Sequence, residues 1–326
     1  MKVTVLGAGA WGTALARVAH EGRHEVTLWG HDAEHLLELQ RTGRNERHLP
    51  DIEIPRTWRF EPDLKRAIEG KECVVVAVPS QAFRAVTESL LQFAGLLVSV
   101  TKGIENGTGL TMCGILRSQA PRAPAIALSG PSFALEVARG IPTAIVAASQ
   151  DRSAAQAVQQ LFHRPTFRVY TSSDPLGVEL GGALKNVVAI AAGVGDGLGF
   201  GDNSKAALIT RAIVEIRRLG VAAGAQAETF AGLSGLGDLT VTCYSRLNRN
   251  RSFGERIGRG ETLETIVSDS DKLAEGYPTA RSAYQLAKRL KVETPIIDEV
   301  HAMLYEKKNP AQAVQDLTRR ESKSEN

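Results

Sequence analysis

Short apolar runs alternate with helical patterns along the first half of the chain. The runs predict buried strands over Lys2–Leu6, Glu25–Trp29, Cys73–Val78, Leu96–Val100, Ala125–Ser129, Thr143–Ala148 and Thr166–Tyr170. The patterns between them predict helices over Thr13–His20, Ala33–Arg41 and Gln81–Leu91. Apolar strands that alternate with helices are typical of a parallel, doubly wound α/β sheet. We expect this sheet to occupy residues 1–173.

The pattern changes near Asp174, after which all the predicted elements are helices. They cover Gly177–Val194, Asn203–Ala223, Arg251–Ile257, Thr279–Arg289 and Pro295–Tyr305. No later stretch has a strand pattern, so we expect an all-helical domain over residues 174–326. A chain of 326 residues is long enough for two domains, each with its own core.

Gly7, Gly9 and Gly12 follow the first strand at the spacing G-x-G-x-x-G and lead into a helix. In a dinucleotide site the first glycine permits the tight turn, the second lets the backbone approach a pyrophosphate, and the third allows close helix–strand packing. The N-terminus of the helix then faces the phosphates. Because a strand precedes the motif and another follows its helix, it predicts a dinucleotide-binding site.

The end of the second strand leaves the choice of cofactor open. An NAD site usually has an acidic residue at the end of this strand, but the sequence here is Trp29-Gly30-His31-Asp32. His31 is placed to meet the adenosine ribose, or a 2′-phosphate when it is protonated. Asp32 is equally consistent with the N-cap of the next helix. The basic loop Arg41–His48 suits a 2′-phosphate or a solvated surface, so the sequence permits either NAD or NADP.

Composition restricts the class of partner. The formal net charge of +3, from 39 basic and 36 acidic side chains, is too small to indicate nucleic acid or a membrane surface. Cys73, Cys113 and Cys243 are far apart and give no metal-ligand spacing, so we expect reduced core thiols, no metal site and a cytoplasmic protein. The first residues enter a strand pattern without a secretory leader, and we expect no membrane span.

One lysine lies in the most apolar predicted helix. Between Val178 and Val194 the only charged side chains are Glu179 and Lys185, and apolar residues surround Lys185 on every helical face. This pattern is typical of a buried central helix. A lysine there loses hydration unless it is paired, and its pKa shifts readily. The alternative is a structural lysine that pairs with a carboxylate or reaches out of the core.

Four other places combine a turn with polar chemistry. Lys102 follows a predicted strand, at the strand end where such sheets bind ligands. Asp238 follows the flexible stretch Gly235–Gly237, and the segment Asn248–Arg251 opens a helix with donors that suit a phosphate. Glu275 precedes another helix. The structural alternatives are a surface lysine, a helix cap, solvated charges and an exposed turn.

Six motifs occur in order along nearly the whole chain, to about Tyr305. They are GAGAWGTALA at residues 7–16, TKG at 101–103, SGPSFA at 129–134, GALKNV at 182–187, GLGDL at 235–239 and RNR at 249–251. In this order they closely resemble bacterial NAD(P)-dependent sn-glycerol-3-phosphate dehydrogenases. An ordered set across two domains is far more specific than any one of its motifs.

The resemblance implies a Rossmann-like N-terminal domain followed by a helical C-terminal domain, with NAD or NADP as cofactor. It also implies the reversible reduction of dihydroxyacetone phosphate to sn-glycerol 3-phosphate by hydride transfer. That product is the backbone precursor of phospholipids. Members of the family are cytoplasmic and are commonly homodimers.

The resemblance also implies roles for single residues. Lys185 matches the family's catalytic lysine, which would donate a proton to the ketone oxygen and reclaim it in oxidation. That role requires a pKa of about 7–8, lowered by burial and cationic neighbours. Lys102 matches a second substrate-side lysine that helps polarise the carbonyl, and Asp238 would accept from the substrate hydroxyl or orient Lys185. The matching contact positions are Gly130, Ser132, Asn248, Arg249 and Asn250 for the substrate, and Gly7, Gly9, Trp11, Gly12, His31, Lys102, Ala134, Arg249, Leu273 and Glu275 for the cofactor.

The chain departs from the family pattern at three positions. Ala10 and Asn248 stand where many relatives have serine, and His48 stands where many have an aromatic residue. Ala10 removes a hydroxyl contact to the pyrophosphate, whereas the backbone donors remain. Asn248 can still donate from its amide.

Two alternative functions remain. A β-hydroxyacid dehydrogenase combines the same kinds of domain, but its lysine is typically followed four residues on by asparagine. Here that position is Ala189, and the adjacent Asn186 points to another face of the helix. A non-catalytic dinucleotide sensor would bind the cofactor without turnover, and it would not need Lys102, Lys185 and Asp238.

Overall fold

The computed structural model describes residues 1–269 and 274–319 and contains two compact units. The first unit consists of Met1–Lys102 and Leu110–Glu179. The second consists of Gly103–Gly109 and Leu180–Asn326. The division therefore falls inside a helix, a few residues after the expected boundary, and it assigns the short segment Gly103–Gly109 to the helical unit.

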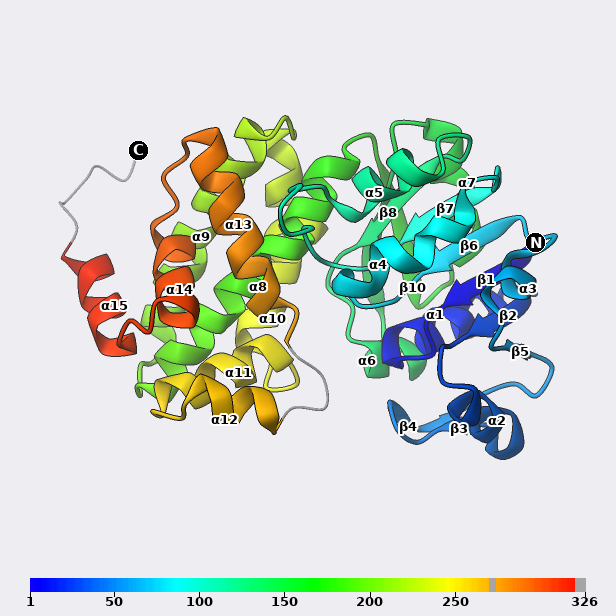
Figure 1. The fold of residues 1–326 in the computed structure, drawn as a ribbon, viewed down its shortest axis with the longest axis horizontal. Helices are drawn as coiled ribbons and strands as arrows, with labels where there is room; N and C mark the ends of the chain where they lie inside the picture. Colours follow the sequence, from blue (N-terminus) through cyan, green and yellow to red (C-terminus); the bar gives the residue numbers. More distant parts are fainter. Residues whose placement is uncertain (270–273, 320–326) are drawn as a thin grey trace. The chain divides into compact units, whose positions relative to one another are not determined.

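The first unit contains an eight-stranded sheet in the order β10-β9-β8-β7-β6-β1-β2-β5 (Figure 1). Its strands are β1 (Lys2–Leu6), β2 (Glu25–Trp29), β5 (Arg59–Glu61), β6 (Cys73–Val76), β7 (Leu96–Ser99), β8 (Ala125–Ser129), β9 (Thr143–Ala148) and β10 (Phe167–Ser172). The predicted strands are all present, and β5 is added at one edge. The strand order reverses between β1 and β6, which is the point at which doubly wound sheets bind their ligands.

The predicted parallel, doubly wound sheet is confirmed, with one antiparallel pairing that the sequence did not predict. β8 pairs with β9 antiparallel, whereas β9 and β10 are parallel to each other. A parallel crossover usually needs a helix that covers the sheet. The connection between β8 and β9 contains only the short helix α6 (Ala134–Ala138), which packs against α1 (Ala10–Glu21). The chain therefore returns beside β8 in the opposite direction.

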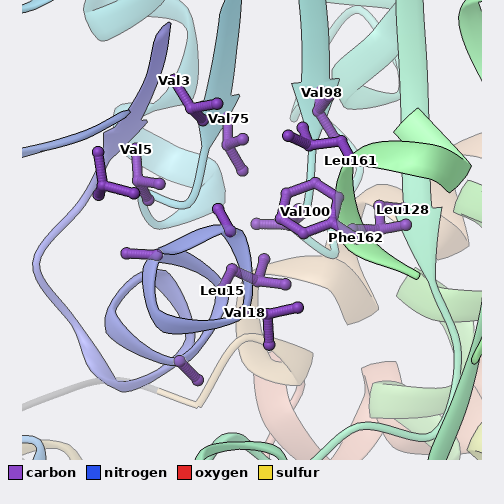
Figure 2. Close-up of a cluster of buried hydrophobic side chains, with 14 of the residues drawn as sticks. Val3, Val5, Leu15, Val18, Val75, Val98, Val100, Leu128, Leu161 and Phe162 are labelled. Atoms are coloured by element: carbon purple, nitrogen blue, oxygen red, sulfur yellow. The ribbon is translucent and has the colours of Figure 1, made fainter. Parts of the chain in front are cut away.

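Helices cover both faces of this sheet. Alternate residues of one strand belong to different cores, so that Val75 packs in one cluster while Val74 and Val76 pack in the other. Figure 2 shows Leu15 of α1 and Phe162 of α7 (Arg152–Phe162) in the first cluster, near the strand side chains. The other helices of this unit are α2 (Ala33–Thr42), α3 (Leu64–Ile68), α4 (Ser80–Thr87), η1 (Glu88–Leu90), α5 (Met112–Gln119) and α7 (Arg152–Phe162). Burial on both faces explains why the strands are continuous apolar runs.

A small ladder replaces part of the loop expected after α2. β3 (Arg44–Asn45) and β4 (Leu49–Glu53) pair antiparallel. Leu49, Ile52 and Ile54 are buried in the same core as α1. Pro50 and an Asp51 with positive φ interrupt the alternation of apolar residues, which is why the sequence pattern did not predict a strand.

Within the described residues the second unit contains helices and no strand, as predicted. They are α8 (Pro175–Gly197), α9 (Asp202–Ala222), η2 (Ala227–Ala231), a π-helical turn η3 (Leu233–Gly237), α10 (Asp238–Tyr244), α11 (Arg249–Gly258), α12 (Leu263–Ser268), α13 (Gly276–Leu290), α14 (Pro295–Tyr305) and α15 (Pro310–Thr318). Figure 1 shows α8 and α13 beside each other in this unit.

α8 is the central helix of the second unit. Among the described residues it is the helix long and apolar enough to cross a membrane, but 94% of its apolar window is buried inside the protein. That burial is typical of the core helix of a soluble protein. Glycines let α11 approach its backbone closely, since a Cβ at Gly193 would overlap the carbonyl oxygen of Arg251 and one at Gly254 would overlap that of Ile190.

Candidate functional site

The glycine-rich loop has the geometry that a dinucleotide requires. Gly7 has φ +126°, and a Cβ there would lie 2.5 Å from the carbonyl oxygen of Ala77. A Cβ at Gly12 would overlap the carbonyl oxygen of Gly7. At Gly9, by contrast, a Cβ would meet no atom within 4 Å. The fold itself therefore requires the first and third glycines, whereas the second is open to the close approach of a ligand.

The N-terminus of α1 supplies the donors. Gly9 is the N-cap residue and makes no side-chain cap, and the first turn carries no acidic residue. The first backbone N–H groups of a helix have no partner within the helix, and the helix dipole favours an anion there. The residues present therefore fit the pyrophosphate of NAD or NADP. Trp11 is half-buried in this first turn.

Asn45 holds the glycine-rich loop from behind. Its Nδ2 atom donates to the carbonyl oxygen of Ala8 at 3.0 Å and to Thr13 Oγ1 at 2.8 Å, and the side chain is fully buried. Sequence reasoning missed this residue because it lies in the basic stretch that we assigned to a loop. The available signal was a lone asparagine in a charged stretch four residues before Leu49, which is too weak to place a long-range contact.

The polar residues after β2 have separate tasks. Asp32 is the N-cap of α2 and accepts from the backbone N–H of His35 at 3.0 Å, which confirms the capping interpretation. That hydrogen bond, with help from the Arg47 guanidinium at 3.2 Å, lowers the pKa of the Asp32 carboxyl. His31 is exposed at the carboxyl end of the strand. It is therefore accessible, whereas Asp32 is occupied by its helix.

Lys102, Gly130, Ser132 and Ala134 lie at the carboxyl ends of β7 and β8. Lys102 Nζ donates to the carbonyl oxygen of Gly130 at 3.2 Å, and Ser132 Oγ donates to the same oxygen at 3.0 Å. Gly130 has φ +146°, and a Cβ there would press on Ile145 at 3.0 Å. Ala134 begins α6 and is half-buried. The structure thus brings together the substrate-side residues predicted for the first unit.

Lys185 is buried in α8, as the sequence pattern predicted. The residue is 5% exposed. Its Nζ atom donates to Asp238 Oδ1 in a short hydrogen bond and to Thr242 Oγ1 at 2.6 Å. Asp238 is 1% exposed and Thr242 is fully buried. Lys185 and Asp238 therefore form a desolvated ion pair. The two acceptors, Asp238 and Thr242, determine the position of the Lys185 Nζ atom.

The lack of a side chain at Gly181 lets the turn before Asp238 pack close to the helix that carries Lys185. A Cβ at Gly181 would lie 2.7 Å from the carbonyl oxygen of Ser234, so the π-helical turn η3 approaches the backbone of α8. Asp238 begins α10 directly after this turn, and Thr242 lies one helical turn further on. Sequence reasoning found Asp238 but missed Thr242, although the i, i+4 spacing places both on one face.

Asn248 and Arg249 form the start of α11. Asn248 is the N-cap, and its Oδ1 atom accepts from the backbone N–H groups of Asn250 at 2.9 Å and Arg251 at 3.1 Å. The Nδ2 atom of the same amide is a donor. Arg249 is exposed, and no carboxylate among residues 1–269 and 274–319 forms a salt bridge with it. This helix start suits an anion.

Asn250 links three helices. Its Nδ2 atom donates to Asn186 Oδ1 at 3.0 Å, and its Oδ1 atom accepts from the backbone N–H of Gly276 at 2.7 Å. The side chain is 6% exposed. Glu275, half-buried, is the N-cap residue of α13, and the predicted cofactor contact Leu273 lies outside the described residues. Asn250 therefore has a structural task, which the sequence did not reveal.

No metal centre was predicted, and the described part of the chain contains no group of three or more His, Cys, Asp or Glu side chains that could hold a metal ion. Cys73, Cys113 and Cys243 are buried and free, which confirms the prediction of reduced core thiols. Burial raises the pKa of the Cys243 thiol to about 12. The thiol near Lys185 is therefore unreactive.

Comparisons with known proteins identify the family. A model described as NAD-dependent glycerol-3-phosphate dehydrogenase N-terminus matches residues 2–155, and the corresponding C-terminus model matches residues 174–315. The NAD(P)+ glycerol-3-phosphate dehydrogenase of Syntrophotalea carbinolica is 48% identical, with 100% of this chain and 99% of the relative covered. That of Citrifermentans bemidjiense is also 48% identical, over 99% of this chain and 98% of the relative. The crystal structure of glycerol-3-phosphate dehydrogenase from Coxiella burnetii has a TM-score of 0.94 at 38% identity, and covers 98% of this chain and 99% of its own. The chain belongs to the NAD-dependent glycerol-3-phosphate dehydrogenase family.

Proposed function

We propose that this chain reduces dihydroxyacetone phosphate reversibly to sn-glycerol 3-phosphate, with Lys185 as the general acid and base. As a member of its family it is an NAD(P)-dependent oxidoreductase that acts on a CH–OH group. The observation that carries the proposed mechanism is the buried Lys185 ammonium held by Asp238 and Thr242.

The first unit holds the cofactor in this proposal. A bound nicotinamide would supply the hydride. The backbone N–H groups at the start of α1 bind the pyrophosphate, and the open space at Gly9 admits it. Trp11, Ala134 and the exposed His31 are the proposed side-chain contacts. Either the ribose hydroxyl or a 2′-phosphate would suit His31, so NAD and NADP both remain.

Lys185 moves the proton. In the reduction, Lys185 Nζ would donate a proton to the ketone oxygen of the substrate and would be left as a neutral amine. In the oxidation direction the amine takes the hydroxyl proton back. Asp238 and Thr242 fix the direction of Nζ, and Asp238 also stabilises the charged form of the lysine against desolvation. We assign Lys102, with Gly130 and Ser132, to the substrate or its carbonyl.

The start of α11 holds the substrate phosphate. Arg249 supplies an exposed guanidinium, and the Nδ2 atom of Asn248 supplies a neutral donor. Asn250 contributes by fixing the start of the helix through Asn186 and Gly276. Glu275 is a further proposed cofactor contact of this unit.

The biological setting follows from the reaction and the family resemblance. sn-Glycerol 3-phosphate is the backbone precursor of phospholipids, so we infer a role in phospholipid synthesis. We also infer a cytoplasmic enzyme that forms a homodimer. Size-exclusion chromatography with light scattering tests the dimer, since a purely monomeric mass at micromolar concentration would contradict it.

Steady-state kinetics test the reaction and the cofactor together. The purified protein should consume NADH or NADPH with dihydroxyacetone phosphate, and should not do so with 2- or 3-oxo acids. Activity only on the acids would support a β-hydroxyacid dehydrogenase. Cofactor binding without turnover on either class would support a dinucleotide sensor. Running both cofactors in parallel gives the preference directly.

A further inference from the structure

The segment Gly103–Gly109, which we call the strap, follows Lys102 directly. Lys102 belongs to the first unit and the strap belongs to the second. After Gly109 the chain returns to the first unit and forms α5. The backbone of Lys102 is therefore joined on one side to β7 and on the other to a segment that helices of the second unit hold.

Ser282 of α13 holds the near end of the strap. Its Oγ atom lies 2.8 Å from the carbonyl oxygen of Ile104 and 2.6 Å from Asn106 Oδ1. One hydroxyl hydrogen serves only one acceptor at a time. Both contacts are satisfied if Ser282 donates to Ile104 and the Asn106 amide is turned so that Nδ2 donates to Ser282. Ser282 is 2% exposed and Ile104 is 4% exposed, so this contact is shielded from water.

Arg289 of α13 holds the C-terminal end of the strap. Its Nη1 atom donates to the carbonyl oxygen of Thr108 at 3.0 Å. The guanidinium also lies against Gly109, where a Cβ would overlap it, and Gly109 has φ +70°. Ser282 and Arg289 are seven residues apart on α13, which is about two helical turns and places them on one face. The strap is thus held along one face of α13.

The same helix is tied to the segment that carries Lys185. Gly276, the first residue of α13, donates its backbone N–H to Asn250 Oδ1, and Asn250 Nδ2 donates to Asn186 Oδ1. A Cβ at Gly276 would lie 2.6 Å from the carbonyl oxygen of Asn186, so the two backbones are also packed together. α13 therefore connects the residue beside Lys185 to the strap that follows Lys102.

We propose that Ser282 is a positioning residue for Lys102 and acts through the strap. This inference rests on the proposed substrate or cofactor contact of Lys102. The physical basis of the proposal is that Gly103, which follows Lys102, would by itself allow the backbone several orientations at this point. The shielded contact of Ser282 with Ile104, together with its contact with the exposed Asn106, restricts the backbone on the C-terminal side of Lys102. The strand β7 restricts the backbone on the N-terminal side.

A double-mutant cycle between Ser282→Ala and Lys102→Met tests the proposal. In the wild-type background, Ser282→Ala should lower kcat/KM for dihydroxyacetone phosphate on the order of tenfold, below the ~100-fold loss that a 1 Å misplacement can cause. In the Lys102→Met background the same change should alter kcat/KM by less than ~twofold, because the residue that Ser282 positions is already gone. Asn106→Ala removes one of the two contacts and leaves the hydrogen bond from Ser282 to the Ile104 carbonyl oxygen, so it should lower kcat/KM less than Ser282→Ala does, and likewise only while Lys102 is present.

Controls separate positioning from a general loss of structure. Gln285→Ala, an exposed position on α13, should leave kcat/KM unchanged. If Ser282→Ala lowers activity equally in both backgrounds, Ser282 acts on the fold and the positioning inference is wrong. If Lys102→Met itself retains wild-type kcat/KM, the proposed role of Lys102 fails and the inference fails with it. If turnover of dihydroxyacetone phosphate is absent in the wild type, the proposed function fails first.

Discussion

Replacing Lys185 by methionine should lower both the turnover rate and the stability of the protein, and the two losses can be measured separately. Methionine keeps the length of the side chain but removes the ammonium that two buried acceptors hold, Asp238 at 1% exposure and Thr242 at 0%. Removal of one partner of a buried pair costs about 3–5 kcal/mol, because the other charge stays desolvated. For a unit of this size that corresponds to a fall in Tm of roughly 6–20 °C. Loss of the general acid should lower kcat by about 100- to 10,000-fold.

A second substitution separates the two effects. In the double variant Lys185→Met/Asp238→Leu no uncompensated charge remains, so most of the lost stability should return, while kcat should stay as low as in the single variant. Thermal unfolding gives the stability, and single-turnover reduction of dihydroxyacetone phosphate gives the rate. Titration with NADH or NADPH should show near wild-type affinity in both variants, because the proposed cofactor residues of the first unit are unchanged.

Two results would refute this reasoning. Near wild-type turnover by Lys185→Met would exclude Lys185 as the proton donor. A double variant no more stable than Lys185→Met would show that the loss of stability does not arise from a stranded Asp238 carboxylate. In that case, the pair would have to be a weakly desolvated contact, contrary to its burial.

Four further substitutions test other parts of the structure. Gly12→Ala should destabilise the protein by about 1–3 kcal/mol, because its Cβ would overlap the Gly7 carbonyl oxygen. Gly9→Ala should leave Tm unchanged, because its Cβ meets no atom within 4 Å, but it should weaken dinucleotide binding in a fluorescence titration. Thr242→Val should lower kcat by about fivefold, the worth of roughly 1 kcal/mol for one hydrogen bond, with unchanged cofactor affinity. Burial raises the pKa of the Glu215 carboxyl from 4.5 to about 7. Between these two pH values the native state holds a proton that the unfolded state has released. The free energy of unfolding should therefore fall by roughly 3 kcal/mol as the pH rises from 4.5 to about 7. Glu215→Gln should flatten the dependence of Tm on pH between about 4.5 and 7, and an unchanged slope would assign it to other groups.

The strands of the first unit could be predicted because each is buried on both faces. Val74, Val75 and Val76 are all fully buried, yet they pack in different cores, so the run stays apolar without alternation. Strand direction could not be predicted in the same way. An apolar run such as β9 has the same composition whether it is parallel or antiparallel, and the short connection after β8 decided the outcome.

The residues of the candidate site also divide into those that could be predicted from the sequence and those that could not. The sequence placed Lys185 in a buried helix and Asp238 after flexible glycines, and the structure joins them. Thr242 and Asn45 could not be found, because their importance lies in contacts with residues far along the chain. Asn45 contacts Ala8 and Thr13 from a stretch that looked like a solvated loop.

The motifs that make the family resemblance specific combine chemistry with packing. Gly181 permits the turn before Asp238 to approach α8, and Gly235 in that turn lies where a Cβ would overlap the carbonyl oxygen of Phe230. Neither glycine offers a functional group, yet without this approach Asp238 could not reach Lys185. Gly181, one helical turn before Lys185, is therefore as much a determinant of the ion pair as the Asp238 carboxylate itself. It follows that Gly181→Ala should weaken the Lys185–Asp238 contact even though it leaves every titratable group in place.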